Sequence, residues 1–423
     1  MPTRRQFLGA SAAIAVASTL PRISQAAQPS SARKKVAFIG TVVREHSHAQ
    51  HFLDRLTFGY AWRGHWQAPR VDVASVYVDQ FPESDLAKDR IARHNLKQFD
   101  TIKDALTLGG TNLAVDGVVI IGEHGRYPDN DKGQKRYPRY KWFKEVVDVF
   151  ESSGRAVPVF NDKHLSTEWD ECVEMVEDSK RLKFPFLAGS SLPVTWRLPS
   201  LDMPFNADLK ESVCVAYGGI DSYDFHAYET AQCMSERRRG GEVGISQVHA
   251  LKGDALWTAL EADNRATTRD LFVSALTCSH NLPVQGGFPT DAVTYEWAKK
   301  ALPDTTGVFV QHRDGFRSAI FLTAIQDFNY AGLLGNGELV ACQMYLPMPT
   351  HGSTTADFFN PLTRHIEDTV LTGKAPYPVE RTLLTSGMVI AGVDSLHAGQ
   401  KPVDTPQMSV RYTAPEASTY WRA

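Results

Sequence analysis

Short apolar runs alternate with amphipathic segments along the first half of the chain. Five runs, several of them rich in β-branched residues, are typical of strands buried on both faces of a sheet: 34–40, 71–78, 117–121, 156–160 and 184–188. The intervening segments 47–60, 101–108, 140–152 and 166–181 have a helical pattern, the last with Ser166 or Thr167 as its N-cap. Strands that alternate with helices predict an α/β domain with a Rossmann-like, doubly wound parallel sheet.

The pattern changes after about residue 200. Longer strands, several with alternating polarity, are predicted at 211–216, 242–251, 306–311, 316–324 and 339–345. Helices are predicted at 226–236, 257–261 and 290–301. These elements predict an α+β domain with a largely antiparallel open sheet. A further helix at 380–396 is expected to pack back on the first domain.

The first residues have the features of an export signal. Arg4 and Arg5 precede an apolar stretch that ends at Leu20, and Ser24-Gln25-Ala26 offers a peptidase site. The apolar stretch is shorter than the roughly 20 residues that a membrane-spanning helix needs. We therefore predict a twin-arginine signal, with the translocase as a partner and a periplasmic or secreted protein as the product.

These patterns divide the 423 residues into five parts. The predicted parts are a twin-arginine signal peptide at 1–27, a linker at 28–33, a Rossmann-like domain of the dinucleotide-binding type at 34–200, an α+β domain for substrate binding and oligomerisation at 201–375, and a C-terminal helix and tail at 376–423 that return to the first domain. The length fits two domains with elaborations.

Composition excludes several classes of function. The net charge is −3 and no basic stripe occurs, so a nucleic-acid partner is not expected. The five cysteines are widely spaced and odd in number, with no CxxC pair, so neither a cysteine zinc site nor a disulfide framework is indicated. We expect most of them to be buried thiols.

The most informative stretch follows the predicted strand at 156–160. It reads Asn161-Asp162-Lys163-His164. Ligands of open α/β sheets bind at the carboxyl ends of the strands, so Lys163 lies where chemistry is expected. The alternative is a surface lysine paired with Asp162.

The first strand ends in Gly40-Thr41-Val42-Val43-Arg44, which holds only the first glycine of the dinucleotide fingerprint. Valine side chains crowd the turn where a pyrophosphate needs close backbone approach. Arg44 can pair with an anion in compensation. Asp79 ends the second strand, where a ribose-binding acid is expected.

The order of these parts resembles the glucose–fructose oxidoreductase and inositol dehydrogenase family (Gfo/Idh/MocA), from about residue 35 to the C-terminus. Asp162-Lys163 matches the first two positions of the family's acid-Lys-Pro tripeptide, with His164 in place of the proline. The glycine-containing stretch 217–229 ends in a helix that carries His226, as at the start of the family's second domain. The resemblance implies NAD or NADP as cofactor, a sugar or cyclic polyol as substrate, and a homo-oligomer. It further implies that Lys163 and His226 hold the substrate hydroxyl at the carbon that gives up hydride.

Further site residues are assigned around this pair. Asp221 is the third catalytic candidate, and either Asp221 or Glu229 is expected to orient His226; Asp221 and Asp224 are alternatively helix caps. The cofactor-binding candidates are Gly40, Thr41, Arg44, Asp79, Glu123 and Asp162. The substrate-binding candidates are His124, Arg126, Tyr223 and Glu229. The long polar segment 127–140 is a candidate lid.

Several histidines lie near the same sheet edge. His46, His48 and His51 follow the first strand, and Glu123-His124 follows the third. These are ligand types of zinc or manganese sites, but no HExxH or HxxxH spacing is present, so no metal site is predicted and loop residues that bind substrate are favoured.

Three functions follow from the sequence. The first is an exported Gfo/Idh/MocA-like oxidoreductase that acts on a sugar or cyclic polyol with a nicotinamide cofactor. The second is a relative with altered cofactor use, a lyase, epimerase or hydrolase of carbohydrate derivatives that uses a metal in one variant. The third is a non-catalytic carbohydrate-binding protein. We expect the first.

Overall fold

A computed structural model of the protein describes residues 33–282, 284–285, 288–289, 292–346 and 356–422. Its elements belong to the compact unit Lys34–Ala423. The predicted signal peptide at 1–27 lies outside the described residues, as does the predicted linker at 28–33 apart from its last residue.

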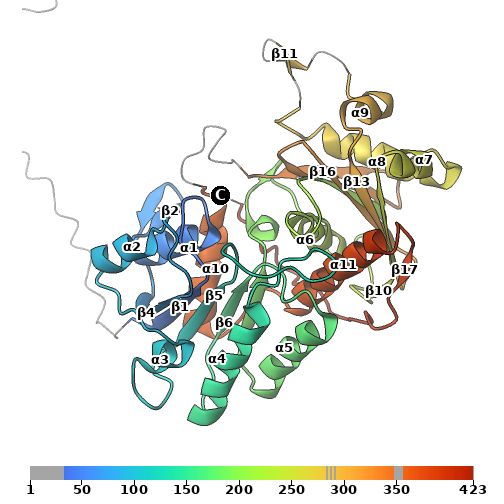
Figure 1. Cartoon of the computed structure of the whole chain (residues 1–423). Helices are drawn as coiled ribbons and strands as arrows, with labels where there is room; N and C mark the ends of the chain where they lie inside the picture. Colours follow the sequence, from blue (N-terminus) through green and yellow to red (C-terminus); the bar gives the residue numbers. More distant parts are fainter. Residues whose placement is uncertain (1–32, 283, 286–287, 290–291, 347–355, 423) are drawn as a thin grey trace, which may run out of the picture. The chain divides into compact units, whose positions relative to one another are not determined.

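The first half of the chain forms a five-stranded parallel sheet (Figure 1). The strand order is β4 (Asp72–Val78), β1 (Lys35–Gly40), β5 (Gly117–Ile121), β6 (Val159–Asp162) and β7 (Phe186–Gly189). Each neighbouring pair is parallel. The predicted Rossmann-like sheet is confirmed.

Helices cover both faces of this sheet because its side chains alternate in direction. Phe38 and Val119 point to the layer of α1 (His48–Thr57) and α10 (Phe359–Thr372). Ile39 and Ile120 point to the opposite layer. That layer consists of α3 (Ile102–Thr107), α4 (Arg139–Ser153) and α5 (Trp169–Arg181). Burial on both faces explains why the strands are continuous apolar runs.

The second sheet has eight strands. Their order is β17 (Val403–Asp404), β10 (Ile245–Lys252), β13 (Thr306–His312), β14 (Arg317–Thr323), β9 (Leu209–Tyr217), β15 (Phe328–Leu334), β16 (Leu339–Met344) and β8 (Arg197–Leu198). Neighbours in this order are antiparallel, apart from the parallel pair β14 and β9. The predicted α+β part with a largely antiparallel sheet is confirmed.

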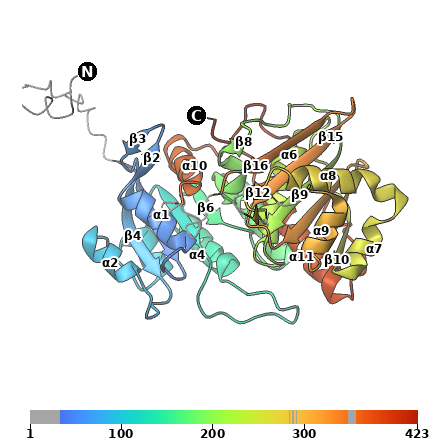
Figure 2. The ribbon, with the colours of Figure 1, turned by 90° about the horizontal axis from the view of Figure 1, so that it is seen from above.

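Helices also lie on both faces of the second sheet (Figure 2). One face packs on α6 (Asp224–Ser235) and α11 (Glu380–His397). The other packs on α7 (Asp254–Leu260), α8 (Ala266–Leu276) and α9 (Tyr295–Ala301). Helix α11 contacts α6, β10 and α5, so residues from both sheets share one core.

The remaining elements are short. They are the hairpin β2 (Tyr60–Trp62) and β3 (His65–Gln67), helix α2 (Ala87–Arg93), the 3₁₀ turns Leu192–Val194 and Asp263–Arg265, and the pair β11 (Val284–Gln285) and β12 (Phe288–Pro289). Among the described residues, no helix has the length and apolar character needed to cross a membrane.

Some local predictions need correction. Helix α5 begins at Trp169 with Glu168 at its N-cap and no side-chain cap, because Ser166 donates its hydroxyl to Glu171 instead. Strand β15 and helices α8 and α10 were not predicted. All five cysteines are free; four are buried and Cys278 is partly exposed.

Candidate functional site

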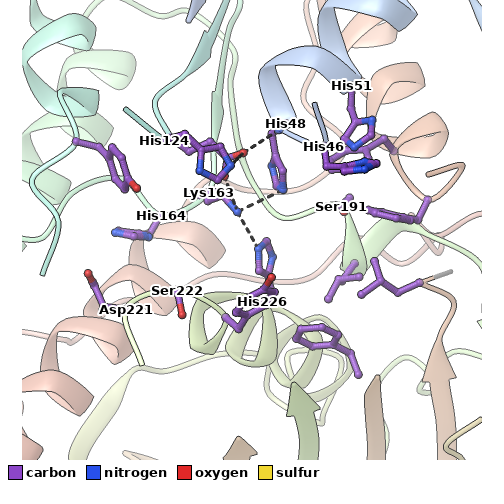
Figure 3. A pocket seen from close by; sticks show the side chains of 18 of the residues that line it. His46, His48, His51, His124, Lys163, His164, Ser191, Asp221, Ser222 and His226 are labelled. Carbon is purple, nitrogen blue, oxygen red and sulfur yellow. Dashed lines mark hydrogen bonds and ion pairs between the residues drawn. The ribbon is translucent and has the colours of Figure 1, made fainter. Parts of the chain in front are cut away.

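A cavity of about 360 Å³ lies at the carboxyl ends of the first sheet's strands (Figure 3). The turns that follow β1, β5, β6 and β7 line one side, and the start of α6 lines the other. Its lining residues are Arg44, His46, His48, His51, Glu123, His124, Tyr137, Arg139, Lys163, His164, Ser191, Leu192, Asp221, Ser222, Tyr223, His226, Phe328, Leu346, Phe358 and Phe359. The volume is that of a site for one small molecule.

Lys163 lies at the centre of a polar cluster in this cavity. Its Nζ is 3.0 Å from Glu123 Oε2, 3.1 Å from His226 Nε2 and 3.3 Å from His48 Nε2. An ammonium group has three N–H donors, and each finds an acceptor here. The alternative of a surface lysine paired with Asp162 is wrong, because the carboxylate that contacts Lys163 is that of Glu123, from the turn after β5.

The backbone at Lys163 is held in a costly conformation. Its φ is 67°, in the left-handed region, and its N–H donates to the carbonyl of Gly189 over 3.0 Å. His46, His124 and Asp221 also have positive φ and also line the cavity. Strained backbone of this kind gathers at functional sites, where the surrounding structure enforces it.

His48 is fixed by Asp162. Its Nδ1 lies 2.8 Å from Asp162 Oδ2, and the Asp162 side chain is buried. Since a carboxylate only accepts, Nδ1 carries the proton and Nε2 accepts from Lys163. Asp162, predicted to bind the cofactor, orients this imidazole in the structure.

His226 is held in the same tautomer by a different partner. Its Nε2 faces the ammonium of Lys163, which only donates, so Nε2 accepts, and Nδ1 carries the proton and donates it to Ser190 Oγ at 2.7 Å. Burial, followed by the nearby Lys163 ammonium and the His48 imidazole, lowers the pKa of His226 well below its usual value, and the ring is therefore neutral at pH 7. The prediction that Asp221 or Glu229 orients this ring is wrong.

The two carboxylates predicted for that task have other partners. Asp221 accepts from Gln134 Nε2 at 3.0 Å and from the N–H of Lys135 at 3.1 Å, both in the loop before α4. It does not cap α6, which starts at Asp224 without a side-chain cap. Glu229 is fully buried and accepts from Thr385 Oγ1 at 2.7 Å. Burial raises the pKa of Glu229 to about 7.

Glu123 supplies the negative charge of the cluster. Burial opposes its ionisation, but the interactions with His48, with the Lys163 ammonium and with His124 outweigh burial and hold its pKa well below the usual value. Its Oε1 accepts the backbone N–H of His48 at 2.8 Å and lies 3.1 Å from His124 Nε2. Glu123 thus sits at the N-terminus of α1.

This placement conflicts with a dinucleotide bound in the usual way. In Rossmann folds the pyrophosphate binds the N-terminus of the first helix. Here that position holds a buried carboxylate, the N–H of His46 donates to Gln50 Oε1, and Ser47 Oγ accepts from the N–H of Gln50. A pyrophosphate would meet a like charge and occupied donors.

The ribose end of that site is also occupied. Asp79 accepts from Tyr77 Oη at 3.1 Å, from Tyr127 Oη at 2.5 Å and from Gln80 Nε2 at 3.2 Å. Val42 is buried beside Gly125. Its Cγ2 lies 3.2 Å from the position that a Cβ atom would take at residue 125. The residues at this edge therefore do not fit NAD or NADP in the arrangement that the fingerprint describes.

One group of metal-ligand type occurs among the described residues. Ligand atoms of His48, Glu123 and Asp162 lie within 4.8 Å of one another. The ammonium of Lys163 contacts two of the three and supplies positive charge there, so a metal ion would compete with it. Of the other candidates, His51 stacks on Phe359, and burial lowers its pKa to about 3; His46 pairs with Glu45 at the surface.

The other predicted residues are distributed as follows. Arg44, His124 and Tyr223 line the cavity, and the Arg44 guanidinium lies 3.2 Å from His124 Nδ1. Arg126 lines a separate hollow together with Arg44. Gly40 ends β1, and Thr41 Oγ1 donates to the carbonyl of Glu123, so both support the turn without lining the cavity.

Sequence reasoning did not single out several lining residues, above all Arg139 at the start of α4 and Tyr137 just before it, which it covered only as part of the candidate lid at 127–140. His164 was noted only as a departure from the family's proline. Ser190, the partner of His226, directly follows β7 and carries no motif. A polar residue just beyond a buried parallel strand was the one signal that pointed to it.

Comparison with known proteins relates only the fold. No protein-family model and no curated protein matches the sequence. Among solved structures, myo-inositol dehydrogenase from Lactobacillus casei with NAD(H) and myo-inositol matches with a TM-score of 0.55 and 11% identity over 88% of this chain and 96% of that chain. GenD2 from gentamicin A biosynthesis with NAD matches with a TM-score of 0.52 and 14% identity over 88% and 96%. The fold resembles that of the Gfo/Idh/MocA dehydrogenases.

A third structure extends this likeness. A myo-inositol dehydrogenase from Corynebacterium glutamicum matches with a TM-score of 0.51 and 11% identity over 88% of this chain and 98% of that chain. The resemblance noted in the sequence therefore extends to the fold of the described chain. At such low identity the structural similarity shows a shared fold and does not show the activity of any one neighbour.

Proposed function

We propose that the protein is an enzyme that transfers protons on a sugar or cyclic polyol, with Lys163 and His226 at the reacting carbon. One observation carries the proposal. The Lys163 ammonium contacts the Glu123 carboxylate and donates to Nε2 of His48 and of His226, inside a cavity at the strand ends. A protein that only binds carbohydrate has no need for such an acid–base cluster.

The cluster suits proton transfer because its tautomers are set. A substrate oxygen that enters the cavity takes the place of one imidazole on the ammonium of Lys163. The released Nε2, that of His226 in our assignment, then accepts the proton of a C–H next to a carbonyl or carboxylate group, while the ammonium stabilises the negative charge that develops on an oxygen of that group. Addition of a proton from solvent to the opposite face gives an epimer, and departure of a group from the next carbon gives an elimination product.

A lyase or epimerase fits these residues better than a hydride-transfer enzyme. The supporting observation is the Glu123 carboxylate at the N-terminus of α1, where a dinucleotide pyrophosphate would bind. A nicotinamide-dependent oxidoreductase is the second candidate, because structures of the same fold contain NAD.

Deuterium exchange tests the proposal. The full chain is incubated in D₂O with sugars, sugar acids and inositols, and proton NMR follows the loss of a ring C–H signal. We expect exchange or elimination without added nucleotide, and its loss in Lys163→Met and His226→Gln. Unchanged exchange in both variants contradicts the assignment.

Nucleotide titration and metal analysis distinguish the oxidoreductase and the metal-assisted enzyme from the metal-free lyase or epimerase. Protein fluorescence is titrated with NAD and NADP, and elemental analysis of the purified protein measures zinc and manganese. Binding of a nucleotide together with nucleotide-dependent oxidation supports the second candidate. Activity that chelation removes and zinc or manganese restores supports a metal-assisted lyase, epimerase or hydrolase, the metal then binding at His48, Glu123 and Asp162.

We propose further that the protein is exported by the twin-arginine translocase to the periplasm or beyond the cell. Arg4 and Arg5 before the apolar stretch support this. Replacement of both by lysine should leave the full-length precursor in the cytosol, as measured by fractionation. A homo-oligomer also stays a proposal, and light scattering of the purified protein measures it.

A further inference from the structure

A buried arginine in the cavity lacks an acidic partner. Arg139 is 3% exposed and lines the cavity. Its Nε donates to the carbonyl of Gly122 over 2.8 Å and its Nη1 to the carbonyl of His164 over 3.2 Å. Among the described residues, no carboxylate lies within ion-pair distance of the guanidinium.

The other described neighbours of Arg139 do not supply a carboxylate at contact distance either. The guanidinium stacks 5.1 Å from the centre of the Tyr137 ring. Asp162 and Asp221 attract it from beyond contact distance; Asp162 is engaged with His48, and Asp221 with Gln134 and Lys135. Arginine stays protonated in proteins, so this is a fixed buried cation with N–H donors to spare.

An imidazole without partners lies beside it. His164 is 5% exposed and lines the same cavity, yet neither ring nitrogen has a hydrogen-bond partner among the described residues. Buried polar groups without partners are rare in folded proteins. Figure 3 shows His164 on the Asp221 side of Lys163, away from His46 and His51. We call Arg139 and His164 the arginine end of the cavity.

We infer that the substrate carries a carboxylate, which binds at the arginine end between Arg139 and His164. The inference rests on the proposed function and names the substrate class, a sugar acid. A carboxylate matches the planar guanidinium fork and accepts one N–H from a neutral imidazole. A phosphate group shares the oxyanion chemistry, but a second negative charge would face Glu123 and Asp221.

The assignment suits the chemistry at Lys163, because His164 follows it directly in the chain. A carbon next to a carboxylate loses its proton more readily when a cation neutralises the carboxylate. The C–H electron pair moves toward the carboxylate carbon as His226 Nε2 takes the proton. The pair then either takes a proton from solvent on the other face, or forms a C=C bond while the oxygen group on the neighbouring carbon leaves with its own bonding pair and takes a proton from solvent.

Ligand binding tests the inference separately from catalysis. Isothermal titration of the full chain measures the Kd for D-glucuronate, D-galacturonate, D-glucose, D-galactose and D-glucose 6-phosphate. We expect each uronate to bind at least tenfold more tightly than its neutral sugar. We expect Arg139→Lys and His164→Phe to lose at least tenfold of that affinity, and Lys141→Met, two residues further along α4 and exposed, to lose none.

The outcomes are distinct. Equal affinity for uronates and neutral sugars, or full uronate affinity in both variants, overturns the inference; so does tight binding of glucose 6-phosphate alone. Because Arg139 also supports the turns, circular dichroism checks the fold, and His164→Phe keeps the test valid if Arg139→Lys fails to fold. Uronate binding without proton exchange defeats the proposed function alone, and proton exchange on neutral sugars alone defeats this inference.

Discussion

The two ends of the cavity satisfy their polar groups in opposite ways. At the lysine end, formed by Lys163, Glu123, His48 and His226, every donor of the ammonium has an acceptor, and each imidazole has a partner on its far nitrogen. At the arginine end, Arg139 has no carboxylate partner and His164 has no hydrogen bond from its ring among the described residues.

The difference separates chemistry from recognition. A satisfied network holds its protons and rotamers in place before substrate arrives, which is the preorganisation that acid–base catalysis requires. Unpartnered buried groups cost free energy in the free protein and regain it only when a ligand completes them. The lysine end is therefore suited to move a proton, and the arginine end to select the molecule.

The largest expected effect comes from removing the cation at the lysine end. Lys163→Met leaves Glu123 buried without its counter-charge, so the free energy of unfolding should fall by about 3 kcal/mol. Proton exchange should fall by about a thousandfold or more. Urea unfolding at pH 7 and NMR exchange measure the two effects. The double variant Lys163→Met/Glu123→Gln should recover most of the stability and none of the activity; a stable single variant contradicts the buried pair.

Next come the groups that set the tautomers. Asp162→Asn can donate to His48 Nδ1 and favour the wrong tautomer, so we expect a rate loss of about a hundredfold. Ser190→Ala removes the partner of His226 Nδ1 and should cost about tenfold. Ser179→Ala, which removes a buried hydroxyl on α5, is the control. Wild-type rates in Asp162→Asn would show that His48 takes no part.

A pH titration tests the arginine end. Burial, then the charges of Arg139 and Lys163, holds the pKa of His164 well below 6.5 in the folded protein. The unfolded chain then binds more protons below pH 6.5, so His164 reduces stability as the pH falls through that value. The glutamine in His164→Gln does not titrate. Relative to this variant, the free energy of unfolding of the wild type should fall by up to about 1.4 kcal/mol for each pH unit below 6.5. Urea unfolding between about pH 7 and pH 5 measures this, and parallel curves would contradict it.

The smallest effect is expected outside the cavity. Asp79 is exposed, and both of its oxygens are engaged by Tyr77, Tyr127 and Gln80. Asp79→Ala should therefore leave the exchange rate within about twofold of wild type. A tenfold rise in the KM of an added nicotinamide nucleotide would instead place Asp79 at a ribose and restore the oxidoreductase interpretation.

Much of the fold could be predicted from local pattern. The five strands of the parallel sheet were predicted to within a few residues, because strands buried on both faces form continuous apolar runs. Helix α10 was missed, although its residues 359–372 cover the first sheet. Nothing local shows that a segment far along the chain returns to a sheet formed by its beginning.

The candidate site divides in the same manner. Position at a strand end was enough to select Lys163, Glu123 and the histidines after β1, since the carboxyl ends of parallel strands meet at one edge. Their partners could not be selected in the same way. Sequence neighbours suggested Asp162 for Lys163, whereas adjacent strands supply its partner and give Asp162 to His48.

By itself the sequence determined the α/β and α+β parts and the edge of the sheet where polar residues gather, because side-chain periodicity and strand ends are local properties. Only the tertiary structure decided which acid meets which base, and that Glu123 rather than a phosphate faces the start of α1. It alone also left Arg139 without a carboxylate partner and the His164 ring without a hydrogen bond among the described residues. Such pairings depend on distances between segments that lie far apart in the chain, and burial then determines which charges persist.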